Sequence, residues 1–180
     1  KGKMINAARV AAEFAAQMPV TETPEQTIEF EGFYHLLGIE GNVEHATLSY
    51  IIRDHDRKRF EKRKAFVQKA AEWMNERYGE GVVTATINDQ YYNMREKIEP
   101  VPHVVDIVIE AMKQCNIPSK VRAIRGGTDG AQLSFMGLPC PNIFAGGLNF
   151  HGPHEFLPIP SLKKASELVV KIIELTAQRG

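Results

Sequence analysis

The chain has 180 residues, 43% of them hydrophobic, and its 22 basic side chains balance 22 acidic ones. This length fits one or two domains of ordinary globular composition. The balanced charge argues against nucleic acid or an anionic membrane as the main partner, and no apolar run approaches the roughly 18 residues of a membrane span. Acidic residues interrupt the basic runs at 57–59 and 62–64, which we interpret as a solvated helix face.

The cysteines indicate the cellular compartment, and the first residues indicate whether the chain is a piece of a longer protein. Cys115 and Cys140 form no CxxC pair, a pattern typical of free thiols in a reducing cytosol, so we predict a cytoplasmic protein. A disulfide between the two is the alternative. The chain starts at Lys1 without an initiator Met and shows no signal peptide, so we expect a processed product or a piece of a longer protein.

The first half predicts the order helix, strand, strand, helix, strand. Apolar periodicity, β-branched runs and turn residues place these elements at residues 4–18, 33–41, 47–54, 57–78 and 82–87, with the last strand extending toward 94. Gly41-Asn42 forms the turn or a bulge between the first two strands, and Asp56 is the predicted N-cap of the second helix. This order matches a βαββαβ unit that lacks its first strand. Such a sheet would expose an unpaired edge, which again favours a piece of a longer protein.

The second half begins after a predicted linker at Pro100 and Pro102. Periodicity predicts helices at 104–115, 131–136 and 162–177 and short strands at 121–124 and 142–145. The alternation of strand and helix indicates a piece of an α/β layer. Two short strands make a poor sheet by themselves.

His151 is the strongest candidate for chemistry. It follows the turn Gly146-Gly147 at the end of an apolar strand, where α/β sheets bind ligands, and neutral imidazole is the commonest metal ligand. Glu155 either orients such a ligand or caps a turn, and His151 is otherwise a hydrogen-bonded loop histidine. A catalytic zinc needs three protein ligands and a water, so the other ligands of a site here would lie elsewhere.

The glycine-rich loop from Arg125 to Gly130 is the second candidate. Its backbone N–H groups at Gly127 and Thr128, together with the Arg125 guanidinium, could hold a substrate carboxylate. A structural turn is the alternative, because the spacing fits neither dinucleotide nor phosphate loops. Asp129 either supports a ligand or caps the helix that follows.

Two further polar stretches admit two interpretations each. Asn93 and Arg95, with the tyrosines before them, line a cleft or form a hinge between domains. Residues 53–56 are rich in titratable groups, which we interpret as a helix cap and a surface ion pair.

Several motifs together resemble one family. The runs at 125–131, 137–142 and 151–156, with further matches at 1–7, 50–54, 91–96 and 174–179, are similar to the zinc-dependent exopeptidases that include a tripeptide aminopeptidase, carboxypeptidase G and succinyl-diaminopimelate desuccinylase. The resemblance covers essentially the whole chain. The combination of motifs is specific, whereas each motif alone is not. It implies an α+β protein: a ferredoxin-like lid and dimerisation domain without its first strand at residues 1–98, and the C-terminal part of an α/β catalytic domain at 99–180.

The resemblance also implies a function. The intact enzyme would release the N-terminal residue from tripeptides with two zinc ions, as a cytoplasmic homodimer joined through the lid. Its general base and most metal ligands would lie upstream of Lys1, so we expect the isolated chain to be inactive. The implied roles are a zinc ligand at His151, supporting acids at Glu155 and Asp129, and substrate contacts at Arg125, Arg95, Asn93, Gly127 and Thr128.

Three alternatives belong to other classes. The chain could be a non-catalytic dimerisation module, a regulatory ferredoxin-like ligand-binding domain, or part of a sibling zinc deacylase or carboxypeptidase. The glycine loop and His151 argue against the regulatory domain, and the runs at 91–96 and 125–131 favour the tripeptidase.

Overall fold

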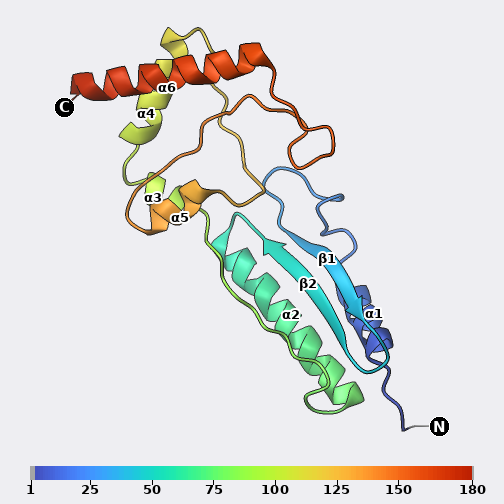
Figure 1. The fold of residues 1–180 in the computed structure, drawn as a ribbon. Helices are drawn as coiled ribbons and strands as arrows, with labels where there is room; N and C mark the ends of the chain where they lie inside the picture. The colour runs from blue at the N-terminus through green and yellow to red at the C-terminus, as the bar shows by residue number, and fades with distance from the viewer. Residues whose placement is uncertain (1–2, 180) are drawn as a thin grey trace. The chain divides into compact units, whose positions relative to one another are not determined.

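The computed structural model describes residues 3–179, which divide into two compact units (Figure 1). The first unit runs to Tyr92 and includes residues 123–125, and the second contains the rest. The division into compact units falls before Asn93. The sequence predicted a domain boundary after residue 98, and that boundary stays a prediction.

The first unit has the predicted order of helix, strand, strand and helix. Its elements are α1 (Ala7–Gln17), β1 (Phe33–Gly41), β2 (Ala46–Arg53) and α2 (Arg57–Tyr78). The strands pair antiparallel from Phe33 opposite Arg53 to Gly41 opposite Ala46, with a bulge between Leu36 and Gly38. The Asn42 side chain closes the hairpin by accepting the N–H groups of residues 44 and 45 at 2.8 and 3.1 Å, as asparagine commonly does in turns.

A core forms between the two helices and the hairpin. Phe14 of α1, Tyr34 of β1 and Met74 of α2 are buried together, and Met74 is completely inaccessible. Full burial of a side chain of this size contributes about 1.5–3 kcal/mol. The predicted cap of α2 is confirmed, since the Asp56 carboxylate accepts the Arg59 N–H at 2.8 Å.

The strand predicted at 82–87 is wrong, as is its extension toward 94. The segment is extended, and Val83, Ala85 and Ile87 are half-buried while the residues between them are exposed. No strand among residues 3–179 pairs with it. The Asn75 side chain instead bonds both the N–H and the C=O of Val83, each at 2.8 Å. The alternation survives because it reflects packing on the core, whereas a strand also needs a neighbouring backbone.

The second unit is helical. Its elements are α3 (Arg95–Ile98), α4 (His103–Gln114), α5 (Asp129–Phe135) and α6 (Ile159–Arg179). α4 and α6 pack through Ile107, Ala111, Leu168 and Leu175. α4, α5 and α6 confirm the three helices predicted in this half, with ends shifted by a few residues, whereas the short α3 was not predicted.

The short strands predicted at 121–124 and 142–145 are wrong. The β-bridge between Leu148 and Phe156 is the sole strand-like pairing that the structure records in this unit's described residues. Val121, at the start of one of these runs, is 87% exposed. β-branched sequence favours a strand only where a partner is available. No helix among residues 3–179 is long and apolar enough to cross a membrane.

Candidate functional site

His151 lies in a closed loop. Leu148 and Phe156 exchange backbone hydrogen bonds of 2.9 and 3.2 Å at its base. Inside the loop the Gly152 N–H donates to the Asn149 carbonyl at 2.9 Å, and both Asn149 and His151 have positive φ, 57° and 65°. Such conformations are uncommon outside glycine and cluster at functional sites. The loop therefore holds His151 in a defined, strained backbone conformation.

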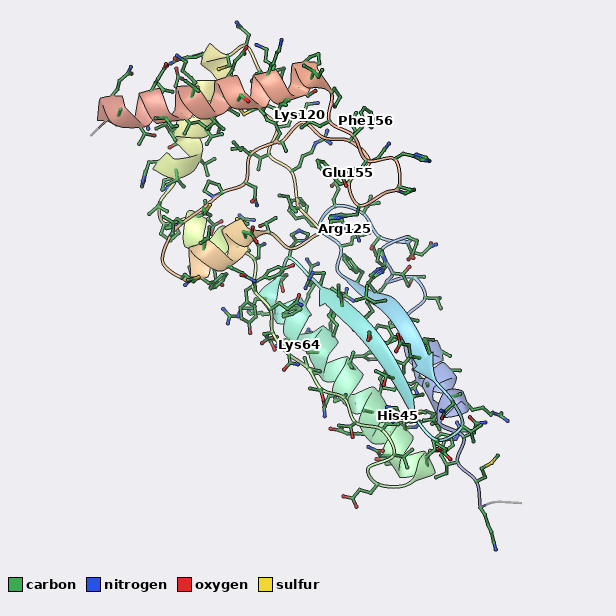
Figure 2. The ribbon with its side chains drawn as sticks, viewed as in Figure 1. His45, Lys64, Lys120, Arg125, Glu155 and Phe156 are labelled. Atoms are coloured by element: carbon green, nitrogen blue, oxygen red, sulfur yellow. The ribbon has the colours of Figure 1, made fainter. Side chains whose placement is uncertain are left out.

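Glu155 stabilises this loop through a hydrogen bond to its backbone. Its carboxylate accepts the His151 backbone N–H at 2.9 Å, and the His151 side chain is exposed. Figure 2 places Glu155 and Phe156 in this loop. Glu155 therefore orders the turn, as one of its two predicted roles requires, and its role in orienting a metal ligand stays a prediction.

The donors present do not fit a complete zinc site. Among residues 3–179, no group of three or more His, Cys, Asp or Glu side chains is placed to hold a metal. A catalytic zinc takes three protein ligands. His151 is thus at most one donor to a centre that needs others.

Thr128, not Asp129, caps the helix after the glycine loop. The Thr128 hydroxyl accepts the Ala131 N–H at 3.3 Å and a hydrogen from Asn142 Nδ2 at 3.2 Å. Asp129 is the first residue of α5 and is exposed, so the capping role considered for it is wrong. Gly127, just before the cap, is also exposed.

Ser134 stabilises the same region from inside, and no sequence pattern indicated it. This fully buried hydroxyl donates to the Gly130 carbonyl at 2.7 Å and accepts the Cys140 N–H at 2.9 Å. A Cβ at Gly130 would lie 2.6 Å from the Cys140 carbonyl oxygen. Close backbone approach therefore accounts for the glycine.

Arg125 belongs to the first unit and is already engaged there. Its Nη1 donates to the Thr27 carbonyl at 2.5 Å and its Nη2 to the Thr27 hydroxyl, while the guanidinium lies 4.7 Å from the centre of the Phe33 ring. A substrate carboxylate at Arg125 would compete with Thr27. Thr27 is buried, and no sequence pattern indicated its role.

Asn93 and Arg95 also have partners within their own unit. The Asn93 side chain accepts the Arg95 N–H at 3.0 Å, and Arg95 Nε pairs with Glu99 at 2.5 Å. The Arg95 side chain is 74% exposed, so solvent screens this pair.

Known proteins resemble this chain over its whole length. Residues 1–82 match the M20_dimer model, a peptidase dimerisation domain. The whole chain is 56% identical over 180 residues to peptidase T of Bacillus licheniformis and 57% identical over 180 residues to that of Parabacteroides distasonis. This chain is similar to peptidase T over its whole length. It covers 44% of the length of each of these relatives.

Solved structures agree on the fold. The chain superposes on aminopeptidase PepT from Bacillus cereus with a TM-score of 0.61 at 21% identity, and on a tripeptidase from Staphylococcus aureus with 0.65 at 19%. Each comparison covers 96% of this chain and 46% of the other. The mixed α and β fold inferred from the sequence is confirmed. Its division into a lid and the C-terminal part of a catalytic domain stays a prediction.

An ion-pair network in the peptidase dimerisation domain differs from prediction. Asp54 was expected in a surface pair, but its side chain is 0% exposed and accepts from Arg63 Nε at 2.9 Å. Arg63 also pairs with Glu22 and is only 14% exposed. A Cβ at Gly32 would lie 2.3 Å from the Asp54 carboxylate. The absence of a side chain at Gly32 thus makes room for the buried pair.

The tyrosines before Asn93 contact cations in the first unit. Arg53 lies 4.8 Å from the centre of the Tyr91 ring, and Arg57 lies 4.1 Å from that of Tyr92. The Tyr92 hydroxyl donates to Asp89 at 2.7 Å, and Lys64 reaches the same carboxylate at 2.9 Å. Hydrogen bonds from Lys64 and then Tyr92 lower the pKa of Asp89.

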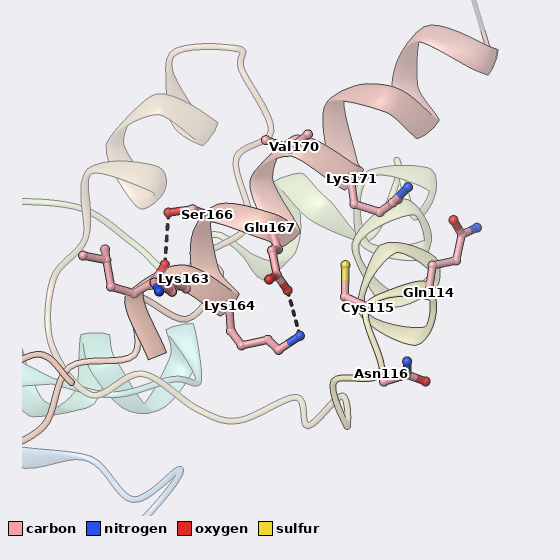
Figure 3. Close-up of a pocket in the computed structure, with 10 residues that line it drawn as sticks. Gln114, Cys115, Asn116, Lys163, Lys164, Ser166, Glu167, Val170 and Lys171 are labelled. Atoms are coloured by element: carbon pink, nitrogen blue, oxygen red, sulfur yellow. Dashed lines mark hydrogen bonds and ion pairs between the residues drawn. The ribbon is translucent and has the colours of Figure 1, made fainter. Parts of the chain in front are cut away.

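An open hollow of about 810 Å³ lies beside the end of α4 and α6 (Figure 3). Lys164 there pairs with Glu167 at 2.7 Å, and Lys171 pairs with Glu174 at 2.5 Å. Hydrogen bonds to these glutamates raise the pKa of both lysines. Cys115 borders the hollow and is a free thiol, as is Cys140. Because Lys164 and Lys171 are each paired with a glutamate, the hollow offers few of the convergent free polar groups of a typical ligand site.

Proposed function

We propose that this chain is part of a metal-dependent aminopeptidase that releases the N-terminal residue from tripeptides. It would contribute the dimerisation domain and one zinc ligand, His151. The observation that carries the proposal is its 56% identity to peptidase T of Bacillus licheniformis along the entire chain. The strained loop that presents an exposed imidazole supports the choice of His151.

Peptidases of this family are metal-dependent, and we propose two zinc ions in the assembled enzyme. Bound zinc polarises the scissile carbonyl and lowers the pKa of a bound water. Within this chain, Glu155 would keep the His151 backbone in place, and Asp129 would support the site as a neighbouring acid. The general base would come from sequence outside these 180 residues.

The proposed substrate contacts are Arg125, Arg95, Asn93, Gly127 and Thr128. Arg95 is the more accessible of the two arginines, because its own side chain is 74% exposed. A bidentate contact to the tripeptide carboxylate would be stronger than this screened pair. The exposed Gly127 and the Thr128 backbone would contact the peptide at the same loop.

We also propose that the dimerisation domain joins two copies in the cytoplasm. Residues 1–82 match a peptidase dimerisation domain. Its role in the whole protein would be to form a homodimer through the lid.

A chimera tests the metal role. Residues 1–180 replace the matching part of the Bacillus licheniformis peptidase T, and tripeptide cleavage and zinc content are measured. We expect an active, zinc-loaded enzyme. His151→Ala should lower activity by more than about 100-fold, because loss of a second-shell partner alone costs about 10–100-fold, and should lower zinc content. His154→Ala, three residues along the same loop, should change neither. Unchanged zinc stoichiometry in the His151→Ala chimera would contradict the assignment.

The dimerisation-domain match also favours a second candidate, a non-catalytic interaction module. An inactive, zinc-free chimera, together with a stable dimer of the 180-residue chain, would favour that alternative. Cleavage of acylated amino acids or C-terminal residues in preference to tripeptides would favour a sibling deacylase or carboxypeptidase.

A further inference from the structure

The guanidinium of Arg125 is held at one end by a single residue of the first unit. Its two terminal nitrogens, Nη1 and Nη2, donate to the carbonyl and to the hydroxyl of Thr27, and Nη1 lies 3.4 Å from the Pro24 carbonyl oxygen. The guanidinium also lies over the ring of Phe33, the first residue of β1 (Figure 2). One end and one face of the guanidinium are therefore fixed.

The Thr27 hydroxyl can accept from Arg125 because its own hydrogen has another partner. It donates to the Thr23 carbonyl at 2.7 Å, and Thr27 is only 7% exposed. A hydroxyl has one hydrogen and two lone pairs, so this bond leaves a lone pair for Arg125. Burial makes both hydrogen bonds electrostatically stronger than they would be in water. The orientation of the guanidinium is thus set by Thr27.

The other edge of the guanidinium has no acceptor. Arg125 Nε is shielded from solvent, and no hydrogen-bond partner reaches it among residues 3–179. The partners that hold the rest of the guanidinium, Thr27, Pro24 and Phe33, carry no charge. A buried donor without an acceptor is destabilising, and more so on a charged group. This edge of Arg125 therefore favours an anionic ligand.

The free edge matches a carboxylate in shape. Nε and Nη2 of an arginine present two parallel N–H groups, which fit the two oxygens of a carboxylate. Thr27 takes one hydrogen of Nη2, so the second stays available beside Nε. A carboxylate at the two terminal nitrogens would compete with Thr27, whereas one at the Nε edge leaves Thr27 in place. Arg125 as a residue is half-buried, which leaves a ligand an approach from the exposed part of the side chain.

We propose that Thr27 is a positioning residue for the C-terminal carboxylate of the substrate. It holds the terminal nitrogens of Arg125 so that the Nε edge binds the carboxylate. This inference rests on the proposed function, which gives Arg125 a substrate contact, and it adds the residue that sets how Arg125 makes that contact. A carboxylate has about four lone-pair positions, so a contact to Arg95 does not exclude it. Thr27 thereby contributes to a preference for peptides with a free C-terminus.

The test uses the Bacillus licheniformis chimera and compares triglycine with triglycine amide, which lacks the carboxylate. We expect the parent to prefer the free peptide through a lower KM. Thr27→Val keeps the shape of the side chain and removes the hydroxyl. It should reduce this preference about tenfold, because a hydrogen bond to a charged group contributes at least about that factor, and should leave kcat unchanged. Thr27→Ser keeps the hydroxyl and should preserve the preference.

Glu31→Ala is the matched control. Glu31 accepts the Ile28 N–H at 2.8 Å in the same loop and is not among the partners of Arg125. It should leave the preference unchanged, whereas a purely structural role of the loop would make Glu31→Ala and Thr27→Val change the KM of both peptides alike. In Arg125→Gln the preference should already be reduced, and adding Thr27→Val should reduce it no further.

A second measurement separates this proposal from the peptidase activity. In the 180-residue chain, the NMR signal of the Arg125 Nε–H, assigned with Arg125→Lys, should shift with triglycine and stay in place with its amide. That shift together with an inactive chimera would contradict the proposed function and support the carboxylate site. An undiminished preference in Thr27→Val, an equal loss in Glu31→Ala, or an Nε–H signal that triglycine leaves in place would overturn the proposal.

Discussion

The first unit packs two helices against a paired hairpin, whereas the second packs two helices against each other. Met74 lies at the centre of a core drawn from α1, α2 and both strands. In the second unit, Leu168 has a similar place in a smaller cluster of α4 and α6. Met136 and Ile173 of that unit are 81% and 62% exposed. The first unit also exposes Val20 and Ile28, at 78% and 69%, so the two units differ in the size of the buried core and not in how completely they cover apolar side chains.

The largest difference should come from the buried ion pair of the first unit. Asp54→Ala leaves Arg63 with 14% exposure and one carboxylate partner fewer, which should lower the free energy of unfolding by about 3–5 kcal/mol. Trp73 is the chain's single tryptophan and lies in α2, so its fluorescence in urea reports this unit.

The second unit offers the matched control. Glu167→Ala breaks the pair with Lys164, in which both side chains are more than half exposed. We expect a change within about 1 kcal/mol by amide exchange in α6. Equal losses in the two units would show that the burial of Asp54 has no energetic consequence.

Truncating the two core centres sharpens the comparison. Met74 and Leu168 are both fully buried, so alanine at either should cost about 2–5 kcal/mol. The first unit should remain folded after Met74→Ala, because the rest of its core persists. Leu168→Ala should release α6 from α4 and abolish amide protection there. Native protection of α6 in that variant would mean that the second unit is as robust as the first.

On the acid side, a small pH effect should appear in the first unit. The pKa of Asp89 is lowered by hydrogen bonds from Lys64 and Tyr92. The resulting contribution to folding stability is fully present above the unfolded-state pKa of about 3.9. It is lost as the pH falls through the lower pKa of Asp89 in the folded state. Asp89 is 37% exposed, so we expect less than about 1 kcal/mol. Asp89→Asn should flatten the acid limb of the urea midpoint, monitored through Trp73; an unchanged limb would exclude this contribution.

The sequence predicted elements whose partners are close along the chain. β1 and β2 formed as expected because a turn at Asn42 brings them together. α2 formed where Asp56 caps it and Met74 lies on its apolar side. The segments at 82–87, 121–124 and 142–145 carry the same β-branched signals, but a strand needs a second backbone that local sequence does not specify.

The candidate site was predictable in part for the same reason. The turn around His151 and Glu155 is local, so adjacent residues indicated it. The contact between Arg125 and Thr27 spans almost a hundred residues of sequence, and no pattern at either end indicates the other. The buried Ser134 was missed because a serine on a helix gives no sign of its depth.

The dependence of His151 on ligands from outside this chain is tested most directly by zinc titration of the 180-residue protein. A chromophoric chelator competes for the metal while release of N-terminal residues from a tripeptide is followed. We expect no zinc site that survives the competition and no release. One zinc retained per chain, with release that the chelator abolishes, would contradict the proposal that His151 is a single donor to a centre completed elsewhere.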